Sequence, residues 1–335
     1  MKKQQLGQGL EVSAVGLGCM GLSHAYGKPT AEGEAVRLIR DAVQLGCTFF
    51  DTAECYGTPD DPHQNEVLVG RALAPYRDRV VIGTKFGLTF DLEDGKVNHD
   101  LVPDARPEAI RRSVEGSLRR LGTDYIDIYY QHRQDPNVPV EVVAEVMRDL
   151  IREGKIRAWG LSEVGEDVIR RAHAVCPVTA VQNRFSMMAR WYEKLFPTLE
   201  ELGIGLVAFS PLANGLLSCA YRDDSAFEKD GSDYRAIMPQ FSPEAMEQNQ
   251  GLLHLVDELA AAHDATPAQI SLAWMICKKP WIAPIPGTRK ELRLRENLGA
   301  ADIELAADEV AAIDTALDGI CMSEVFGGSV VKKAS

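Results

Sequence analysis

Four side chains of the kinds that move protons lie at, or just beyond, the ends of short apolar runs. Asp51 ends the second such run, and Tyr56 follows it five residues later. Lys85 ends the third run, and His132 comes just after the fourth. An isolated tyrosine hydroxyl has a pKa of about 10, and a neighbouring ammonium group lowers this value because it favours the anion. We expect Lys85 to supply that charge, Asp51 to hold Lys85, and His132 to donate a hydrogen bond to a carbonyl oxygen beside Tyr56.

Each of the four residues also has an ordinary structural interpretation. Aspartate after a strand often caps a turn or helix, lysine is usually solvated, and tyrosine and histidine are often structural hydrogen-bonding residues. The chemical interpretation rests on their occurring together at the ends of strands. Reduction of a carbonyl group would also need a hydride donor, which a nicotinamide dinucleotide can supply.

A phosphate-binding segment is predicted at residues 286–297, which follow the last apolar run and turn into a helix. The free N–H groups of a helix N-terminus attract anions, and Arg289, Lys290 and Arg293 add positive charge there. A solvated basic helix face is the alternative. Residues 16–21 (GLGCMG) match the dinucleotide fingerprint G-x-G-x-x-G, but no helix opens after them, so we interpret these glycines as the tight exit of the first strand.

The elements that must position these residues alternate between strand and helix. Short apolar runs suit parallel strands that are covered on both faces, and they lie at residues 12–17, 48–51, 80–85, 126–130, 156–161, 179–182, 206–209 and 282–285. Helical periodicity marks residues 30–45, 66–73, 107–121, 140–153, 166–174, 192–202, 243–263 and 267–278. Gly46, Gly122, Gly154 and Gly203 follow helical stretches, as C-cap glycines do.

This alternation predicts an α/β fold of the (β/α)8 TIM-barrel type, whose active sites lie at the carboxyl ends of the strands. No linker or break in composition divides residues 1–335, so we expect one domain. Residues 222–241 interrupt the rhythm with a polar stretch after the seventh strand. They are expected either to form a loop over the active-site end or to be a surface insertion.

Composition narrows the class of protein. Hydrophobic residues make up 45% and charged residues 25% of the chain, which excludes a disordered protein. The net charge of −13 opposes general binding to nucleic acid or anionic lipid, so only a local cationic site is expected. No signal peptide or membrane span is evident, and the cytoplasm is the expected compartment. Seven scattered cysteines, without Cys-x-x-Cys spacing, predict free thiols and no zinc site.

The chain resembles the aldo-keto reductase superfamily over nearly its whole length. The resemblance rests on residues 50–57 (FDTAECYG), 83–85 (GTK), 127–133 (DIYYQHR) and 284–289 (PIPGTR) taken together. It implies a (β/α)8 barrel that prefers NADPH to NADH, while the histidines and cysteines, which lack ligand spacing, indicate no metal. It also implies that Asp51, Tyr56, Lys85 and His132 form the catalytic tetrad, with Tyr56 as the proton donor.

The same resemblance implies a set of cofactor contacts. Ser162, Glu163 and Gln182 would lie at the nicotinamide amide, and Phe209 would stack on the nicotinamide ring. Many relatives have Asn in place of Glu163 and Tyr in place of Phe209. Thr288, Arg289 and Arg293 would hold the 2′-phosphate of the adenosine. The remaining implied contacts are Gly18, Met20, Ser210, Pro211, Leu212, Gly215 and Gly287 around the nucleotide, with Glu296 and Asn297 on the adenine.

The closest likeness is to a bacterial and plant branch that reduces aldehydes, pyridoxal among them, and reads Gly-Leu-Ser-Glu at residues 160–163. This branch commonly reads Ser-Glu-Tyr-Ser after Gln182, whereas residues 183–188 here are NRFSMM. We therefore expect NADPH-dependent reduction of small aldehydes or ketones. The alternatives are a nucleotide-binding redox sensor or regulatory subunit with slow turnover, as potassium-channel β subunits are, and a Schiff-base aldolase that uses Lys85.

Overall fold

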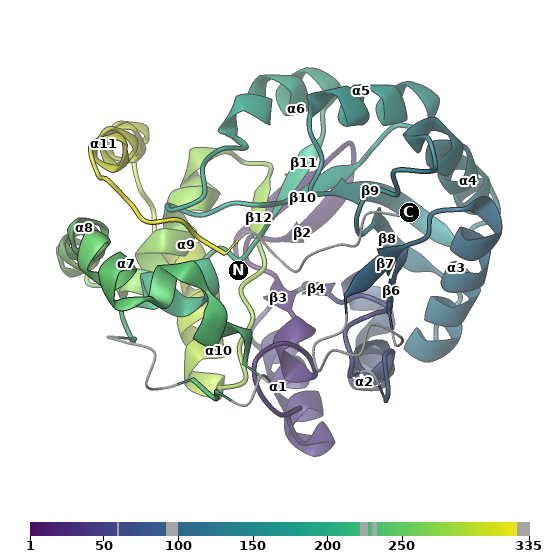
Figure 1. Ribbon diagram of the computed structural model, residues 1–335, viewed down its shortest axis with the longest axis horizontal. Helices are drawn as coiled ribbons and strands as arrows, with labels where there is room; N and C mark the ends of the chain where they lie inside the picture. Colours follow the sequence, from purple (N-terminus) through teal and green to yellow (C-terminus); the bar gives the residue numbers. More distant parts are fainter. Residues whose placement is uncertain (59, 92–99, 222–226, 230–232, 327–335) are drawn as a thin grey trace.

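A parallel sheet of eight strands forms the centre of the molecule in the computed structural model, which describes residues 1–58, 60–91, 100–221, 227–229 and 233–326. Each strand pairs with its neighbours in chain order, and the helices lie around the strands (Figure 1). The strands are β3 (Leu17–Gly18), β4 (Phe49–Asp51), β5 (Val81–Phe86), β8 (Ile126–Gln131), β9 (Ile156–Ser162), β10 (Ala180–Arg184), β11 (Gly205–Phe209) and β12 (Ile282–Pro284).

The first and last strands of this sheet meet along a seam that closes the barrel. The Gly16 N–H donates to the Pro284 carbonyl at 2.9 Å, and the Gly18 N–H donates to the Pro286 carbonyl at 3.2 Å. A Cβ on Gly18 would lie 2.7 Å from the Ile285 carbonyl oxygen, so only glycine permits this approach. The predicted (β/α)8 barrel is confirmed.

Helices follow the strands as the periodicity predicts, with small differences at their ends. The outer ring consists of α1 (Glu32–Gln44), α2 (Gln64–Leu73), α3 (Pro107–Leu121), α4 (Val140–Arg152), α5 (Glu166–Val175), α6 (Phe196–Leu202), α9 (Pro267–Lys278) and α10 (Glu291–Gly299). Gly122 and Gly203 end α3 and α6 in the left-handed conformation, both at φ 64°. Thr266 caps α9 through a hydrogen bond from the Gln269 N–H.

Two expected elements are divided. The expected helix over residues 243–263 consists of α7 (Pro243–Gln248) and α8 (Gln250–Ala262), which are separated at Asn249. The Asn249 side chain bonds Ser323 at 2.8 Å, and this contact ties the break to the segment that follows α11 (Ala307–Asp318). Helices α7, α8 and α11 lie at the left edge of the ring in Figure 1.

The strand expected at residues 12–17 is likewise two elements. Its first part belongs to β2 (Leu10–Ser13), which pairs antiparallel with β1 (Lys3–Leu6), and only Leu17 enters the barrel. Apolar residues continue through both parts, so periodicity could not separate them. The hairpin lies at the amino ends of the strands, because Gln5 N–H donates to the Pro280 carbonyl just before β12.

The barrel interior holds its own apolar cluster, distinct from the larger core between strands and helices. Leu6 and Val12 of the hairpin join Phe49, Ile128 and Val207 of the strands in this cluster. A second hairpin, β6 (Leu88–Phe90) with β7 (Leu101–Pro103), follows β5 at the opposite end. The hairpin β1–β2 therefore fills the amino end of the barrel and leaves the carboxyl end for a binding site.

Candidate active site

A cavity of about 720 Å³ opens at the carboxyl ends of the strands. Asp51, Tyr56, His132, Ser162 and Gln182 contribute to its lining, and they come from four strands and the loops after them. Residues at this end of a barrel are supplied by separate strands, so their side chains converge although they are far apart in the chain.

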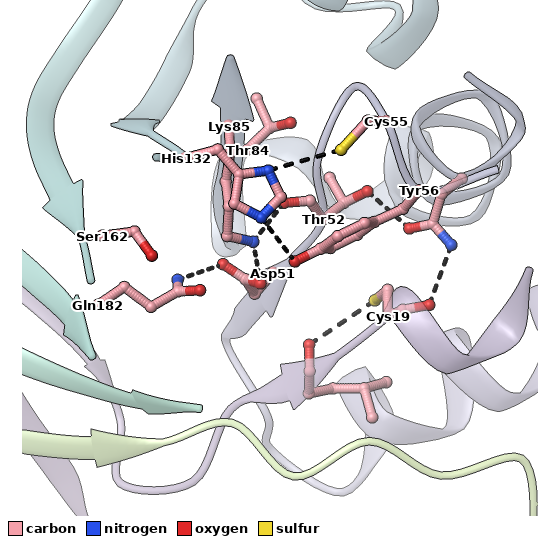
Figure 2. Close-up of polar contacts among 12 residues, drawn as sticks. Cys19, Asp51, Thr52, Cys55, Tyr56, Thr84, Lys85, His132, Ser162 and Gln182 are labelled. Atoms are coloured by element: carbon pink, nitrogen blue, oxygen red, sulfur yellow. Dashed lines mark hydrogen bonds and ion pairs between the residues drawn. The ribbon is translucent and has the colours of Figure 1, made fainter. Parts of the chain in front are cut away.

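Lys85 and Asp51 form a buried ion pair beneath this cavity. The Lys85 Nζ lies 2.5 Å from Asp51 Oδ1 and donates to the Thr52 carbonyl at 2.7 Å. Asp51 Oδ2 accepts a hydrogen bond of 2.7 Å from the Gln182 side chain (Figure 2). Burial lowers the pKa of Lys85, but the charge of Asp51 and the hydrogen bond to it contribute to a net upward shift, so the ammonium stays charged.

Tyr56 and His132 face each other above this pair (Figure 2). The Tyr56 hydroxyl lies 3.5 Å from His132 Nε2, and Lys85 Nζ lies 4.7 Å from the centre of the Tyr56 ring. On the other side of the imidazole, the Cys55 sulfur lies 3.5 Å from Nδ1. A thiol that donates to Nδ1 would leave the imidazole proton on Nε2, where it faces the cavity.

Burial determines the protonation states of Tyr56 and His132. It raises the pKa of Tyr56 to about 12, against the opposing effect of the Lys85 charge. The predicted lowering of the Tyr56 pKa is therefore wrong in its net direction, because removal from water disfavours the phenolate more than one ammonium favours it. Burial, followed by the Arg133 and Lys85 charges, holds the pKa of His132 well below its usual value, so the imidazole is neutral.

A second network, which the sequence analysis missed, holds the loop that carries Tyr56. The Asn65 amide donates to the Cys19 carbonyl at 3.0 Å and to the Ser23 hydroxyl at 2.6 Å. Ser23 in turn donates to the Tyr56 carbonyl at 2.7 Å, and Thr52 donates to Asn65 at 2.6 Å. Asn65 lies on a helix and gives no sequence signal of this kind.

The cavity brings together nearly all of the expected cofactor contacts. The expected contacts that line it are Gly18, Met20, Ser162, Gln182, Phe209, Ser210, Pro211, Leu212, Gly215, Gly287, Thr288, Arg289, Arg293, Glu296 and Asn297. Glu163 is outside this lining and instead accepts a hydrogen bond of 3.0 Å from the Arg184 backbone N–H.

The turn after β11 carries backbone strain at the cavity wall. Ser210, Ala213 and Asn214 adopt positive φ values of 49°, 49° and 60°, which non-glycine residues rarely do. Such strain clusters at functional sites, and left-handed residues shape concave backbone surfaces that accept anions. These properties suit the pyrophosphate of a dinucleotide.

The cationic cluster before α10 splits into two parts. The Arg289 guanidinium donates to the Gly21 carbonyl at 2.5 Å and to the Lys28 carbonyl at 2.8 Å, so it ties the cluster to the loop after β3. Arg293 pairs with Glu296 at 2.6 Å on the same helix. Thr288 and Lys290 lie beside them on the lining, and the group matches the donors that a phosphate requires.

The segment 222–241 contributes to the cavity through Tyr234, Arg235 and Met238. The Tyr234 N–H donates to the Ala25 carbonyl at 2.9 Å, so this part of the segment contacts the loop after β3. Residues 222–226 and 230–232 lie outside the described residues. The described part of the segment, residues 233–241, therefore lies beside the cavity at the active-site end.

Three further properties concern the described residues alone. All seven cysteines lie among the described residues as free thiols. The described side chains form no cluster of histidine, cysteine and carboxylate groups that could hold a metal ion. Within the same ranges, every helix is too short or too polar to cross a bilayer.

Comparison with known proteins agrees with this geometry. The sequence model of the aldo/keto reductase family matches residues 14–318. The glycerol dehydrogenase of Gluconobacter oxydans is similar, with 28% identity, a TM-score of 0.85, and coverage of 98% of this chain and 99% of that one.

Two further solved structures are similar at 29% identity. An aldo-keto reductase of Bacillus halodurans in its holo form gives a TM-score of 0.75 and coverage of 94% of this chain and 96% of that one. A thermostable aldo-keto reductase, solved with the inhibitor epalrestat, gives 0.74, with 94% and 100% covered. With its barrel, its buried Asp51–Lys85 pair and this match, the chain belongs to the aldo/keto reductase family, whose members are oxidoreductases.

Proposed function

We propose that this protein reduces small aldehydes or ketones to alcohols with NADPH as the reductant. The observation that carries the proposal is the approach of the Tyr56 hydroxyl to His132 Nε2, 3.5 Å apart on the cavity lining and above the buried Lys85–Asp51 pair. Bound NADPH would supply the hydride that the carbonyl carbon accepts.

The residues of the chain would handle the proton and the charge. Tyr56, kept protonated by its raised pKa, donates its hydroxyl proton to the carbonyl oxygen as negative charge develops there. The Lys85 ammonium stabilises the phenolate left behind, and Asp51 holds that ammonium in place. The neutral imidazole of His132 donates from Nε2 to the same oxygen and orients the carbonyl group.

The residues present fit a phosphorylated dinucleotide. Phe209 offers an aromatic face on the cavity wall, and the strained turn that follows it suits a pyrophosphate. Thr288, Lys290 and Arg293 offer a hydroxyl and two cations at the start of α10, which suits the 2′-phosphate that distinguishes NADPH from NADH.

The Schiff-base alternative has little support. An amine that forms a Schiff base must be unprotonated and reach the substrate. Lys85 is fully buried, charged and bonded to both Asp51 and the Thr52 carbonyl. No contact of the described residues favours a regulatory subunit over an enzyme, so this alternative becomes an outcome of the test.

The test follows NADPH consumption with aromatic, aliphatic and dicarbonyl substrates and pyridoxal, and the reverse reaction with glycerol, since one similar structure is a glycerol dehydrogenase. We expect Tyr56→Phe to lower kcat by about 10²- to 10⁴-fold, because it removes the proton donor, while NADPH still binds. Undiminished turnover in Tyr56→Phe would refute the role of Tyr56. Tight NADPH binding without turnover by the unaltered protein would favour the regulatory alternative.

A second variant tests the choice of cofactor. Arg293→Ala should raise the Kd for NADPH by about tenfold or more, since a charge-assisted contact to phosphate is lost, with little change for NADH. Arg295→Ala is the matched control, because Arg295 lies on the same helix but outside the cavity lining. Its guanidinium forms an ion pair of 2.8 Å with Glu291. Equal effects on NADPH and NADH would contradict a 2′-phosphate site at Arg293.

The cytoplasm remains our proposed compartment. Seven free thiols, including the buried Cys19, Cys47, Cys55 and Cys176, suit a reducing environment.

A further inference from the structure

Arg184 is a buried cation at the edge of the same cavity. It ends β10, has 2% of its surface exposed and contributes to the cavity lining. Its guanidinium carbon lies 4.9 Å from the centre of the Phe209 ring. Its Nε and Nη1 atoms are buried and make no hydrogen bond to any part of the chain that the structure describes.

Burying the Arg184 guanidinium in this way costs free energy unless a ligand accepts hydrogen bonds from it. A guanidinium group keeps its charge at neutral pH even where burial lowers its pKa, as burial and the Arg133 charge do here. A buried charge that lacks hydrogen bonds loses its solvation without compensation. Glu163 acts on Arg184 electrostatically, but its carboxylate accepts its hydrogen bond from the Arg184 backbone N–H.

The other buried or half-buried arginines of the lining differ from Arg184 in this respect. Arg133 donates to the His132 carbonyl at 2.7 Å and to the Ser162 hydroxyl at 3.2 Å. Arg235 forms an ion pair with Asp233 at 2.6 Å, and Arg289 donates to backbone carbonyls. Of these four guanidinium groups, only that of Arg184 has buried nitrogen atoms that make no hydrogen bond to the described residues.

The surrounding charge favours an anion at this place. Arginine and lysine side chains on the lining are Arg133, Arg184, Arg235, Arg289, Lys290 and Arg293, and its carboxylates are Asp51 and Glu296. Both carboxylates have cationic partners, Lys85 and Arg293. The cavity is therefore locally cationic within a chain of net charge −13, and such a cavity concentrates anionic ligands.

We propose that the Arg184 guanidinium is an anion subsite, which binds a phosphate or carboxylate oxygen of a ligand held in this cavity. The proposal rests on the proposed function for the identity of that ligand. Two sources offer the same chemistry: the pyrophosphate of the nucleotide, or an anionic group on the carbonyl substrate itself. Planar guanidinium donors suit either group.

The nucleotide arm of the test uses Arg184→Met, which keeps an apolar stem of similar length, and Arg184→Lys, which keeps the charge. Dissociation constants are measured by fluorescence for NADPH and for adenosine 2′-monophosphate, which carries the adenosine and the 2′-phosphate but neither phosphate of the pyrophosphate. If the pyrophosphate is the ligand, Arg184→Met weakens the binding of NADPH by about tenfold or more and that of adenosine 2′-monophosphate far less. Arg184→Lys then restores part of the loss.

The substrate arm compares 4-carboxybenzaldehyde with 4-nitrobenzaldehyde at saturating NADPH. The two aldehydes have similar size, but only the first carries a charge. Their different intrinsic reactivities cancel because each aldehyde is compared between the variant and the unaltered protein. If the substrate supplies the anion, Arg184→Met lowers kcat/KM for the carboxylate by about tenfold or more relative to the nitro compound, mainly through KM.

Either selective loss supports the anion subsite and identifies its source. Equal losses for both members of each pair, or no loss in either pair, overturn it. Thermal unfolding separates these results from misfolding, because removal of an unpartnered buried charge should leave Tm unchanged or raise it. Failure of the proposed function has a different signature: the unaltered protein would reduce neither aldehyde, while the two nucleotide affinities could still be compared.

Discussion

Single residues in this site owe their properties to burial as much as to their partners. Lys85 and His132 are buried and Tyr56 is half-buried on the cavity wall, and burial opposes the charged form of each. Only Lys85 has a carboxylate in contact, and only Lys85 keeps its charge. Lys85 is therefore a fixed cation, His132 a neutral donor and Tyr56 a protonated acid, because only Lys85 has an ion-pair partner.

Glu54 gives a prediction at this scale. Burial, and then the Glu66 charge, raise its pKa to about 7, whereas an unfolded chain holds glutamate at about 4.3. The native state therefore binds this proton more tightly, so the stabilisation is complete at pH values below the unfolded pKa and is lost as pH rises through about 7.

Glu54→Gln, which keeps an acceptor for the Gly87 N–H, should remove this dependence. We expect the free energy of unfolding of the variant, relative to the unaltered protein, to rise by about 3 kcal/mol between acidic and mildly alkaline pH. Urea unfolding at about pH 5 and pH 8 would measure it. A constant difference between the two proteins at both pH values would show that Glu54 titrates normally.

Sequence reasoning found the residues whose position follows from the end of a strand. Asp51 and Lys85 were located because parallel strands end at one edge of a barrel, so their side chains meet. Asn65 and Ser23 were missed, since they act through backbone carbonyls that only the folded loops bring close. Arg184 stood out as a departure in sequence, but its lack of partners is a property of the packed structure.

Among the elements, the hairpin β1–β2 is expected to contribute to the stability of the barrel but not to catalysis. Leu6 is fully buried inside the barrel with Val12 and Phe49, at the end opposite the cavity. The sequence showed only a continuous apolar stretch here, because the turn between hairpin and barrel strand has no polar break.

Leu6→Ala should therefore lower the free energy of unfolding by about 2 to 5 kcal/mol through the cavity it leaves, while KM for NADPH stays the same. Chemical denaturation and steady-state kinetics on one preparation would test both parts. Leu10→Ala, on the same hairpin but only partly buried, is the control and should cost less. A large change in KM would mean that the hairpin communicates with the cavity.

Over the whole molecule, the charge of the cavity is opposite in sign to the net charge of the chain. The chain carries a net charge of −13, yet the cavity gathers Arg133, Arg184, Lys290 and Arg293. Anions are repelled by most of the surface and attracted at one place, and mobile ions screen such an attraction.

NADPH binding should consequently weaken with salt. We expect its Kd to rise by about fivefold between about 0.02 M and 0.3 M potassium chloride, and less in Arg293→Ala than in the Arg295→Ala control. Titrations at several ionic strengths would show the slope. A Kd independent of salt would argue that the nucleotide is held by uncharged contacts.

The seam between β3 and β12 also affects the order in which the site can form during synthesis of the chain. Asp51, Tyr56 and Lys85 are synthesised more than 190 residues before Ile285, Gly287 and α10, which contribute one part of the cavity lining. A nascent chain that has not yet reached β12 has an open barrel and lacks Lys290 and Arg293, although it already contains Arg133 and Arg184. The cavity around the reactive residues is therefore complete only after β12 and α10 have been synthesised.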